Sequence, residues 1–199
     1  MLIFALDARR ISVVMILAIL MVLGAGIFRL VANGLQWWNI APVAAIALLG
    51  GMYLGRRYAL WVPLAVLAVT DIVLNVRMGY PMFYWPRAFD YVAFLLVGLL
   101  GLWARERKLG TKVSAAIATP FLFFLISNFA VWLFGTSLAN APYAKTFSGL
   151  MECYAAGIPF LRGTVVGDWG FMALFALSAV LLGRTSSERS HSLVAEVRA

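Results

Sequence analysis

An aspartate within a long apolar segment is the first feature of this sequence that could do chemistry. Asp71 lies in the run from residue 58 to 76, and Asn75 follows it one helical turn later on the same face. A carboxylate at the centre of a membrane-spanning helix costs at least about 2.5 kcal/mol. Such a residue is expected to face the protein interior or a wet cavity, so Asp71 predicts a functional site.

Other polar and aromatic residues could join Asp71 around a small molecule. Asn128 lies inside the apolar run 113–134, and Glu152 and Tyr154 belong to a later amphipathic segment. Aromatic walls with a few fixed polar groups are typical of small-molecule sites. The candidate ligand-binding residues are Trp37, Trp38, Asn39, Asp71, Asn75, Tyr84, Trp85, Asn128, Trp132, Glu152 and Tyr154.

Simpler interpretations compete with a binding site. The aromatic residues could be anchors at the membrane interface, where Trp and Tyr concentrate. Asp71 could be paired inside the protein with Arg77 or Asn128.

An enzyme could use Asp71 with Glu152 or Asp168 as acid and base or as metal ligands, although the sequence has no HExxH, GxSxG or Asp-x-Asp motif. Asp168, in the first turn of the last predicted helix, could also simply complement the positive helix N-terminus.

The chain has one cysteine and one histidine. Cys153 has no cysteine partner for an intramolecular disulfide, and His191 lies in a polar tail. A His-based triad and a zinc site of Cys and His ligands are therefore excluded, and no other metal site is predicted. Beside Glu152, Cys153 is expected to be a buried thiol. A soft ligand to a metal-containing vitamin such as cobalamin is the alternative.

The composition indicates an integral membrane protein. The 199-residue chain is 64% hydrophobic and 12% charged, whereas about a quarter of the residues in a soluble domain are charged. The apolar runs are continuous rather than alternating, which favours helices over an outer-membrane barrel. Because the basic residues behind the net charge of +8 are scattered between apolar segments, the expected partner is the lipid bilayer and not nucleic acid.

Six apolar segments predict six transmembrane helices, over residues 11–32, 40–54, 58–76, 88–104, 113–134 and 164–183. The segment 77–90 contains two prolines and is expected to be an interfacial loop. Residues 143–157 predict a short amphipathic helix before the last span, with Pro159 and Gly163 breaking the chain between them. The predicted fold is all-α and polytopic, with one six-helix domain over residues 1–184 and a polar, disordered cytoplasmic tail over 185–199.

The basic residues also predict the orientation of these spans. With six spans both termini lie on one side, and 11 of the 16 Lys and Arg residues belong to that side. The positive-inside rule therefore places both termini in the cytoplasm. The connections on the opposite side are long and aromatic, so recognition is expected on the outer side.

Two groups of residues carry a resemblance to a known family. The first half holds Asn39-x-x-Pro42, Ala44, Ala47, Gly50-Gly51, Pro63-Leu64 and Asp71. The second half holds Ser127-Asn128-Phe129, Trp132, Tyr143-x-x-Thr146-x-x-Gly149-Leu150-x-x-Cys153-Tyr154, Ile158-Pro159-Phe160 and Asp168. Over residues 39–182 this pattern resembles a family of bacterial six-span membrane proteins classed only as a domain of unknown function. The resemblance implies a bacterial cytoplasmic (inner) membrane protein and assigns no activity.

In its layout the chain is also similar to the substrate-binding S components of energy-coupling-factor vitamin transporters. That similarity implies a transport-related protein that captures a vitamin-sized molecule from the outer side and works with an energising membrane partner. S components usually dock that partner through small residues four apart in the first helix, whereas here the nearest such pair is Ala41 and Ala45 in the second. The alternatives are an intramembrane carboxylate enzyme and an accessory subunit whose Ala- and Gly-rich second helix docks on a partner. No cofactor is indicated.

Overall fold

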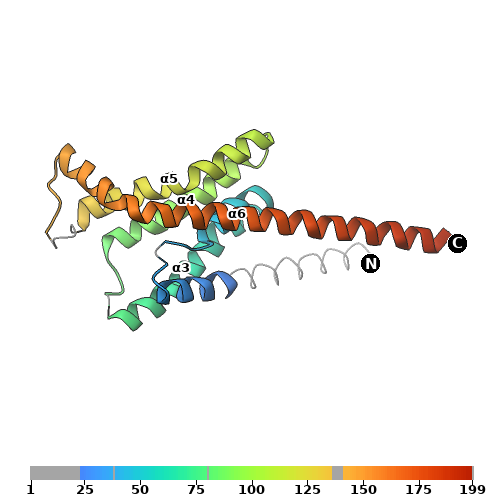
Figure 1. The fold of residues 1–199 in the computed structure, drawn as a ribbon, viewed down its shortest axis with the longest axis horizontal. Helices are drawn as coiled ribbons and strands as arrows, with labels where there is room; N and C mark the ends of the chain where they lie inside the picture. The colour runs from blue at the N-terminus through green and yellow to red at the C-terminus, as the bar shows by residue number, and fades with distance from the viewer. Residues whose placement is uncertain (1–22, 38, 80, 136–140, 199) are drawn as a thin grey trace.

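The computed structural model describes residues 23–37, 39–79, 81–135 and 141–198, with side chains described up to residue 178. Every regular element within these ranges is a helix (Figure 1). The first 12 residues of the predicted first span, 11–22, lie outside the described ranges, and residues 23–34 are helical. The later elements are α2 (Val43–Leu49), the π-helix η1 (Gly50–Leu54), α3 (Arg56–Met78), α4 (Trp85–Ala104), α5 (Leu109–Phe134) and α6 (Phe147–Arg198).

Four of these helices are long and apolar enough to cross a membrane. They are α3, α4, α5 and the part of α6 from Phe147 to Ser178. The apolar stretch formed by α2 and η1, Val43–Leu54, is shorter. Over its described residues the chain is thus all-helical with four long apolar helices.

The boundaries of α4 and α6 correct the sequence-based expectation. Helix α4 begins at Trp85 with Pro86 in its first turn, where a proline loses no helical hydrogen bond, so the expected loop is shorter. Helix α6 runs without interruption from Phe147 to Arg198, with Pro159 inside it. The predicted break near Pro159 was therefore wrong, while the disorder expected of the tail, residues 185–199, stays a prediction. Figure 1 shows the start of α6 at an angle to the rest, as expected where a proline removes a hydrogen bond.

Helix α2 forms the centre of the bundle. All residues from Val43 to Leu48 are buried, as expected of a helix that is apolar on every side. One core cluster joins Ala44, Leu48 and Met52 to Val97 of α4 and Met172 of α6. The residues Val43–Leu48 of the Ala- and Gly-rich second helix, which the accessory-subunit alternative uses as a docking face, are therefore covered by the chain's own helices.

Glycines allow α4 to pack very closely on its neighbours. A Cβ atom on Gly101 would lie 2.2 Å from the carbonyl oxygen of Leu48 in α2, and one on Gly98 would lie 2.5 Å from that of Ala59 in α3. Such distances are far below van der Waals contact, so only glycine fits at both positions. Small residues of this kind let helix backbones approach in membrane proteins.

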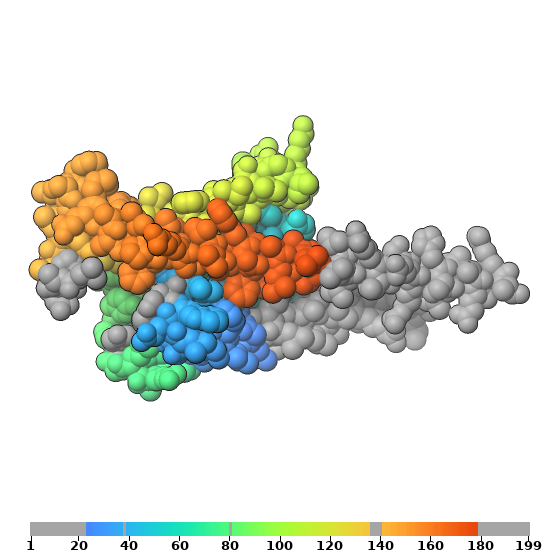
Figure 2. Space-filling model, in the orientation of Figure 1, coloured from blue at the N-terminus to red at the C-terminus, as the bar shows by residue number. Residues whose placement is uncertain are grey.

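The bundle has two ends that differ in chemistry. We call the end at which the chain passes from helix 23–34 to α2, from α3 to α4 and from α5 to α6 the loop end (Figure 1). The opposite end holds the tight turn at Gly55 and the basic connection between α4 and α5. In Figure 2, α6 lies along the visible face beside helix 23–34, and Phe28 contacts Phe171 edge-to-face with ring centroids 4.9 Å apart.

Candidate functional site

Asp71 is held by two arginines from different helices. Its Oδ1 atom lies 2.6 Å from Nη1 of Arg29, in helix 23–34, and 2.7 Å from Nη1 of Arg87, in the first turn of α4. Its Oδ2 atom accepts a hydrogen bond of 3.1 Å from the hydroxyl of Tyr91. Asp71 is only 5% exposed and the two arginines are partly buried, so the carboxylate and the two guanidinium groups form a charged cluster that joins three helices and is buried at its centre.

Neighbouring hydroxyl groups hold the two arginines in place. Arg29 donates to the Thr70 hydroxyl, which itself donates to the carbonyl of Val66 at 2.7 Å. Arg87 donates to the Tyr84 hydroxyl at 2.7 Å, and its guanidinium lies 4.9 Å from the centre of the Tyr84 ring. Both arginines are therefore fixed by hydrogen bonds as well as by the charge of the carboxylate.

This cluster corrects the expected internal pairing of Asp71. We expected Arg77 or Asn128 to be the partner, but Arg77 is exposed near the end of α3 and Asn128 bonds within α5, where its amide donates to the carbonyl of Phe124 at 2.9 Å. The partners are instead Arg29 and Arg87. Asp71 is nevertheless not sealed in dry packing, because it also lines a cavity.

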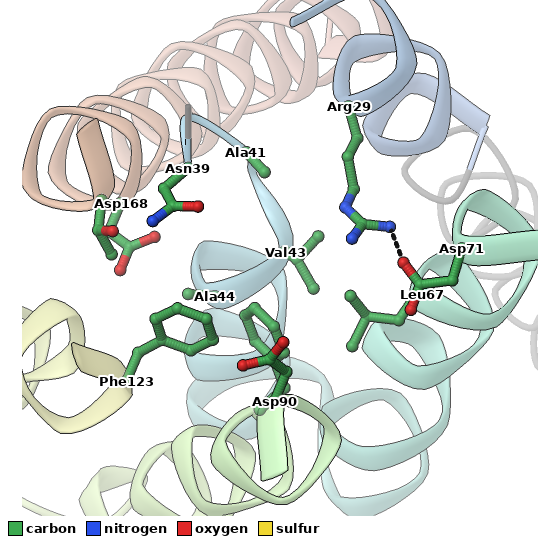
Figure 3. A pocket seen from close by; sticks show the side chains of 12 residues that line it. Arg29, Asn39, Ala41, Val43, Ala44, Leu67, Asp71, Asp90, Phe123 and Asp168 are labelled. Atoms are coloured by element: carbon green, nitrogen blue, oxygen red, sulfur yellow. Dashed lines mark ion pairs between the residues drawn. The ribbon is translucent and has the colours of Figure 1, made fainter. Parts of the chain in front are cut away.

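The cavity beside Asp71 has a volume of about 120 Å³ and lies in the half of the bundle nearer the loop end. Figure 3 shows side chains from several helices and from the connection before α2 converging on it. Its polar lining residues are Arg29, Asn39, Asp71, Asp90, Thr164 and Asp168. Its apolar lining residues are Ala41, Val43, Ala44, Leu67, Phe94 and Phe123. The cavity is therefore rich in carboxyl groups for a space inside an apolar bundle.

Asp168 and Asn39 lie next to each other on the side of this cavity away from Asp71 (Figure 3). The backbone of residues 39–41 crosses α6 directly at Gly167, where an added Cβ would lie 3.1 Å from Cα of Ile40. Asn39 adopts a left-handed conformation with φ of 61°, which Asn tolerates better than most residues. Gly167 and the conformation of Asn39 thus bring the connection against Asp168.

A second cavity of about 300 Å³ adjoins the first. The two share Asn39, Asp90 and Phe123 as lining residues, and the second extends along α5 and α6 to Ser127, Asn128, Val131, Tyr143, Cys153, Ala156, Gly157 and Phe160. A hydrogen bond joins α5 to α6 in the wall of the second cavity, where the Cys153 thiol donates to the Asn128 carbonyl at 3.3 Å. Burial and the neighbouring Cys153 raise the pKa of the Tyr143 phenol, so this hydroxyl stays protonated in the cavity wall.

The other predicted ligand-binding residues lie elsewhere. Trp37 and Trp85 are exposed, Trp132 donates to the carbonyl of Ala144, and Tyr154 donates to that of Leu125. Glu152 is exposed, and the Tyr84 hydroxyl accepts a hydrogen bond from Arg87. Asn75 is buried, and its side-chain oxygen has no hydrogen-bond partner among the described residues. None of these residues lines either cavity, and Trp38 falls outside the described residues. Their binding of a ligand remains a prediction.

The structure adds three residues that we did not select. Arg29, Arg87 and Asp90 surround Asp71 or line the cavities. Arg29 is the one charged residue in the apolar segment 11–32, and this unusual position could have identified it as a candidate site residue. Arg87 was assigned to a loop, and only the start of α4 at Trp85 places it inside a helix. Asp90 lay where the predicted loop 77–90 and the predicted span 88–104 overlap.

No metal centre emerges among the described residues, because no three His, Cys, Asp or Glu side chains are grouped so that they could hold an ion. The alternative enzyme pairs Asp71 with Glu152 or Asp168. Asp71 and Asp168 line one cavity, whereas Glu152 lies outside both. What the arrangement can do most directly is hold a small polar molecule between fixed charges and aromatic walls.

Comparison with known proteins gives one family. A family model described as "Family of unknown function (DUF6580)" matches residues 9–190. No curated protein and no solved structure matches the chain in these comparisons.

Proposed function

We propose that this chain, which belongs to the family of unknown function DUF6580, is an integral membrane protein that captures a small molecule in its two adjoining cavities. The observation that carries the proposal is that these cavities are adjacent. Asn39, Asp90 and Phe123 line both of them, so a molecule that occupied both would contact the charged wall and the aromatic wall at once. Ligand sites in proteins commonly measure roughly 300–1,000 Å³, and the larger cavity, of about 300 Å³, reaches that range.

We further propose that the loop end faces the outside of a bacterial cytoplasmic membrane. In this topology the helix that ends at residue 34, the stretch Val43–Leu54 and the four long helices make six spans, with both termini in the cytoplasm. The exposed basic residues Arg56, Arg57, Arg105 and Lys108 belong to the opposite end, which supports this orientation. A ligand would then enter from the outer side.

The layout supports a role in transport, in the manner of an S component that binds a vitamin-sized molecule. Transport would require an energising membrane partner. That partner could not dock on α2, because α2 is buried inside the bundle. The lipid-facing surfaces of the long helices, which carry many exposed apolar side chains, are the surfaces left for it.

Native mass spectrometry of the full chain, released from the membranes of cells that produce it, tests the binding proposal. We expect a small-molecule adduct that survives mild detergent removal. Ala156 lines the larger cavity, so Ala156→Phe should fill this space and abolish the adduct. The neighbouring Ala155 is exposed and lines neither cavity, so Ala155→Phe is the matched control and should retain it. An adduct equally retained by both variants, or absent from the unsubstituted chain, would refute the proposal.

A further inference from the structure

We propose that the captured molecule carries a positively charged amine, and that Asp168 is the residue that pairs with it. This inference rests on the proposed function, because it names the class of molecule that the two cavities take. It follows from the surroundings of Asp168, from the charges around it and from the shape of the adjoining space.

Asp168 is a buried carboxyl group that the protein leaves incompletely paired. It is 3% exposed, and its Oδ2 atom has no hydrogen-bond partner among the described residues. Figure 3 shows its side chain directed into the smaller cavity beside Asn39. Burying a carboxylate without a partner is costly, so a residue of this kind in the wall of a cavity indicates a group that comes from the ligand.

The charges around the cavity leave Asp168 without a compensating cation. Arg29 and Arg87 both contact Asp71, so each of these two arginines already has a carboxylate partner. Within the described part of the chain Asp168 has no ion pair. A cationic ligand group would supply this missing partner.

An ammonium group suits this position better than a metal ion. Among the described residues no three His, Cys, Asp or Glu side chains could hold an ion together, whereas an ammonium group needs up to three hydrogen-bond acceptors of ordinary geometry. Besides Asp168, the amide oxygen of Asn39 lines the cavity, and Thr164 donates its own proton to the carbonyl of Phe160 at 3.2 Å. The Thr164 oxygen is therefore available to accept.

The remaining space favours an apolar body attached to that amine. Phe123 lies where the two cavities meet, and the larger one continues past Val131 and Phe160. Aromatic and aliphatic walls of this kind stabilise an apolar ligand by removing it from water. The expected ligand class is therefore a small amine with an aromatic or aliphatic body.

Three probes of similar shape and different charge test this inference. Isothermal titration of the full chain in lipid nanodiscs at pH 7 would compare 2-phenylethylamine, 2-phenylethanol and 3-phenylpropionate. We expect the amine to bind at least about tenfold more tightly than either other probe, since a charged hydrogen bond inside a protein is worth that factor or more. Asp168→Asn should remove this preference. Glu106→Gln, which removes an exposed carboxylate at the opposite end, should keep it.

Equal or tighter binding of the alcohol or the propionate to the unsubstituted chain would overturn the inference and leave the binding proposal standing. Failure of all three probes, in a chain that still carries a native adduct, would also overturn it. Because the preference is first measured on the unsubstituted chain, the test does not depend on whether Asp168→Asn folds. Should that variant not fold, Asp168→Glu, which keeps the charge and moves it, should weaken amine binding selectively.

Discussion

Replacing Asp71 with Asn should destabilise the folded chain strongly. Asp71 is 5% exposed and lies within 2.6 and 2.7 Å of the guanidinium groups of Arg29 and Arg87. Asparagine keeps the shape of the side chain but removes the negative charge, so both partly buried guanidinium groups lose their counter-ion. Removing one partner from a buried ion pair typically costs about 3–5 kcal/mol, and we expect a loss near the lower end of this range because both arginines keep some contact with solvent.

Two further variants show whether charge is the cause of that loss. Arg29→Met should cost less, about 1.5–3 kcal/mol for a lost charged hydrogen bond, because Asp71 would still contact Arg87 and Tyr91. Adding Arg29→Met to Asp71→Asn should recover part of the stability, since it removes one of the two uncompensated charges. The two substitutions should therefore be non-additive.

The assay is reversible unfolding in mixed detergent and lipid micelles, followed by far-ultraviolet circular dichroism. Arg77→Gln is the matched control, because Arg77 is on the same helix as Asp71 but exposed. It should change the free energy of unfolding by less than about 0.5 kcal/mol. If Asp71→Asn cost no more than this control, or if the double variant lost the sum of the two single losses, the buried charged cluster would not be what joins these helices.

Three more predictions follow from other parts of the structure. Gly101→Ala should lower the free energy of unfolding by about 1–3 kcal/mol, because the added methyl group overpacks against α2. Gly110→Ala, at a position with no neighbour within 4 Å, should leave it nearly unchanged. Equilibrium unfolding of both variants measures this difference. Asn39→Gly should keep the stability of the chain, while Asn39→Ala should lose about 1 kcal/mol because of its left-handed backbone; equal stability of the two would contradict this. In a chain without its native cysteine, Met82→Cys should react with an impermeant maleimide on intact cells, and Lys108→Cys should react only after permeabilisation; the reverse pattern would invert the proposed topology.

Much of the fold could be predicted from continuous apolar runs. The expected spans 58–76 and 113–134 correspond to α3 (Arg56–Met78) and α5 (Leu109–Phe134), because apolar length largely determines where such helices lie. Proline was the main source of error. Pro86 was treated as a helix breaker but lies in the first turn of α4, and Pro159 lies within the continuous α6, as membrane helices allow.

The candidate site was only partly predictable. Asp71 stood out because a charge in an apolar run is costly, but its partners Arg29 and Arg87 lie far from it in sequence and meet it only through helix packing. For Asp168 the sequence also allowed a simpler role, as an acid that complements the positive N-terminus of a helix. That explanation fails because α6 begins at Phe147. Sequence spacing could not show that Asp168 and Asp71 line one cavity.

A crystal structure of the chain purified from the membranes in which it is made would test the binding site most directly. We predict electron density from a small molecule that spans both cavities, passes between Asn39, Asp90 and Phe123, and places a polar group within hydrogen-bond distance of Asp168. A lipid chain that enters between helices and fills this space, or side chains that close it, would contradict the proposed capture of a small molecule.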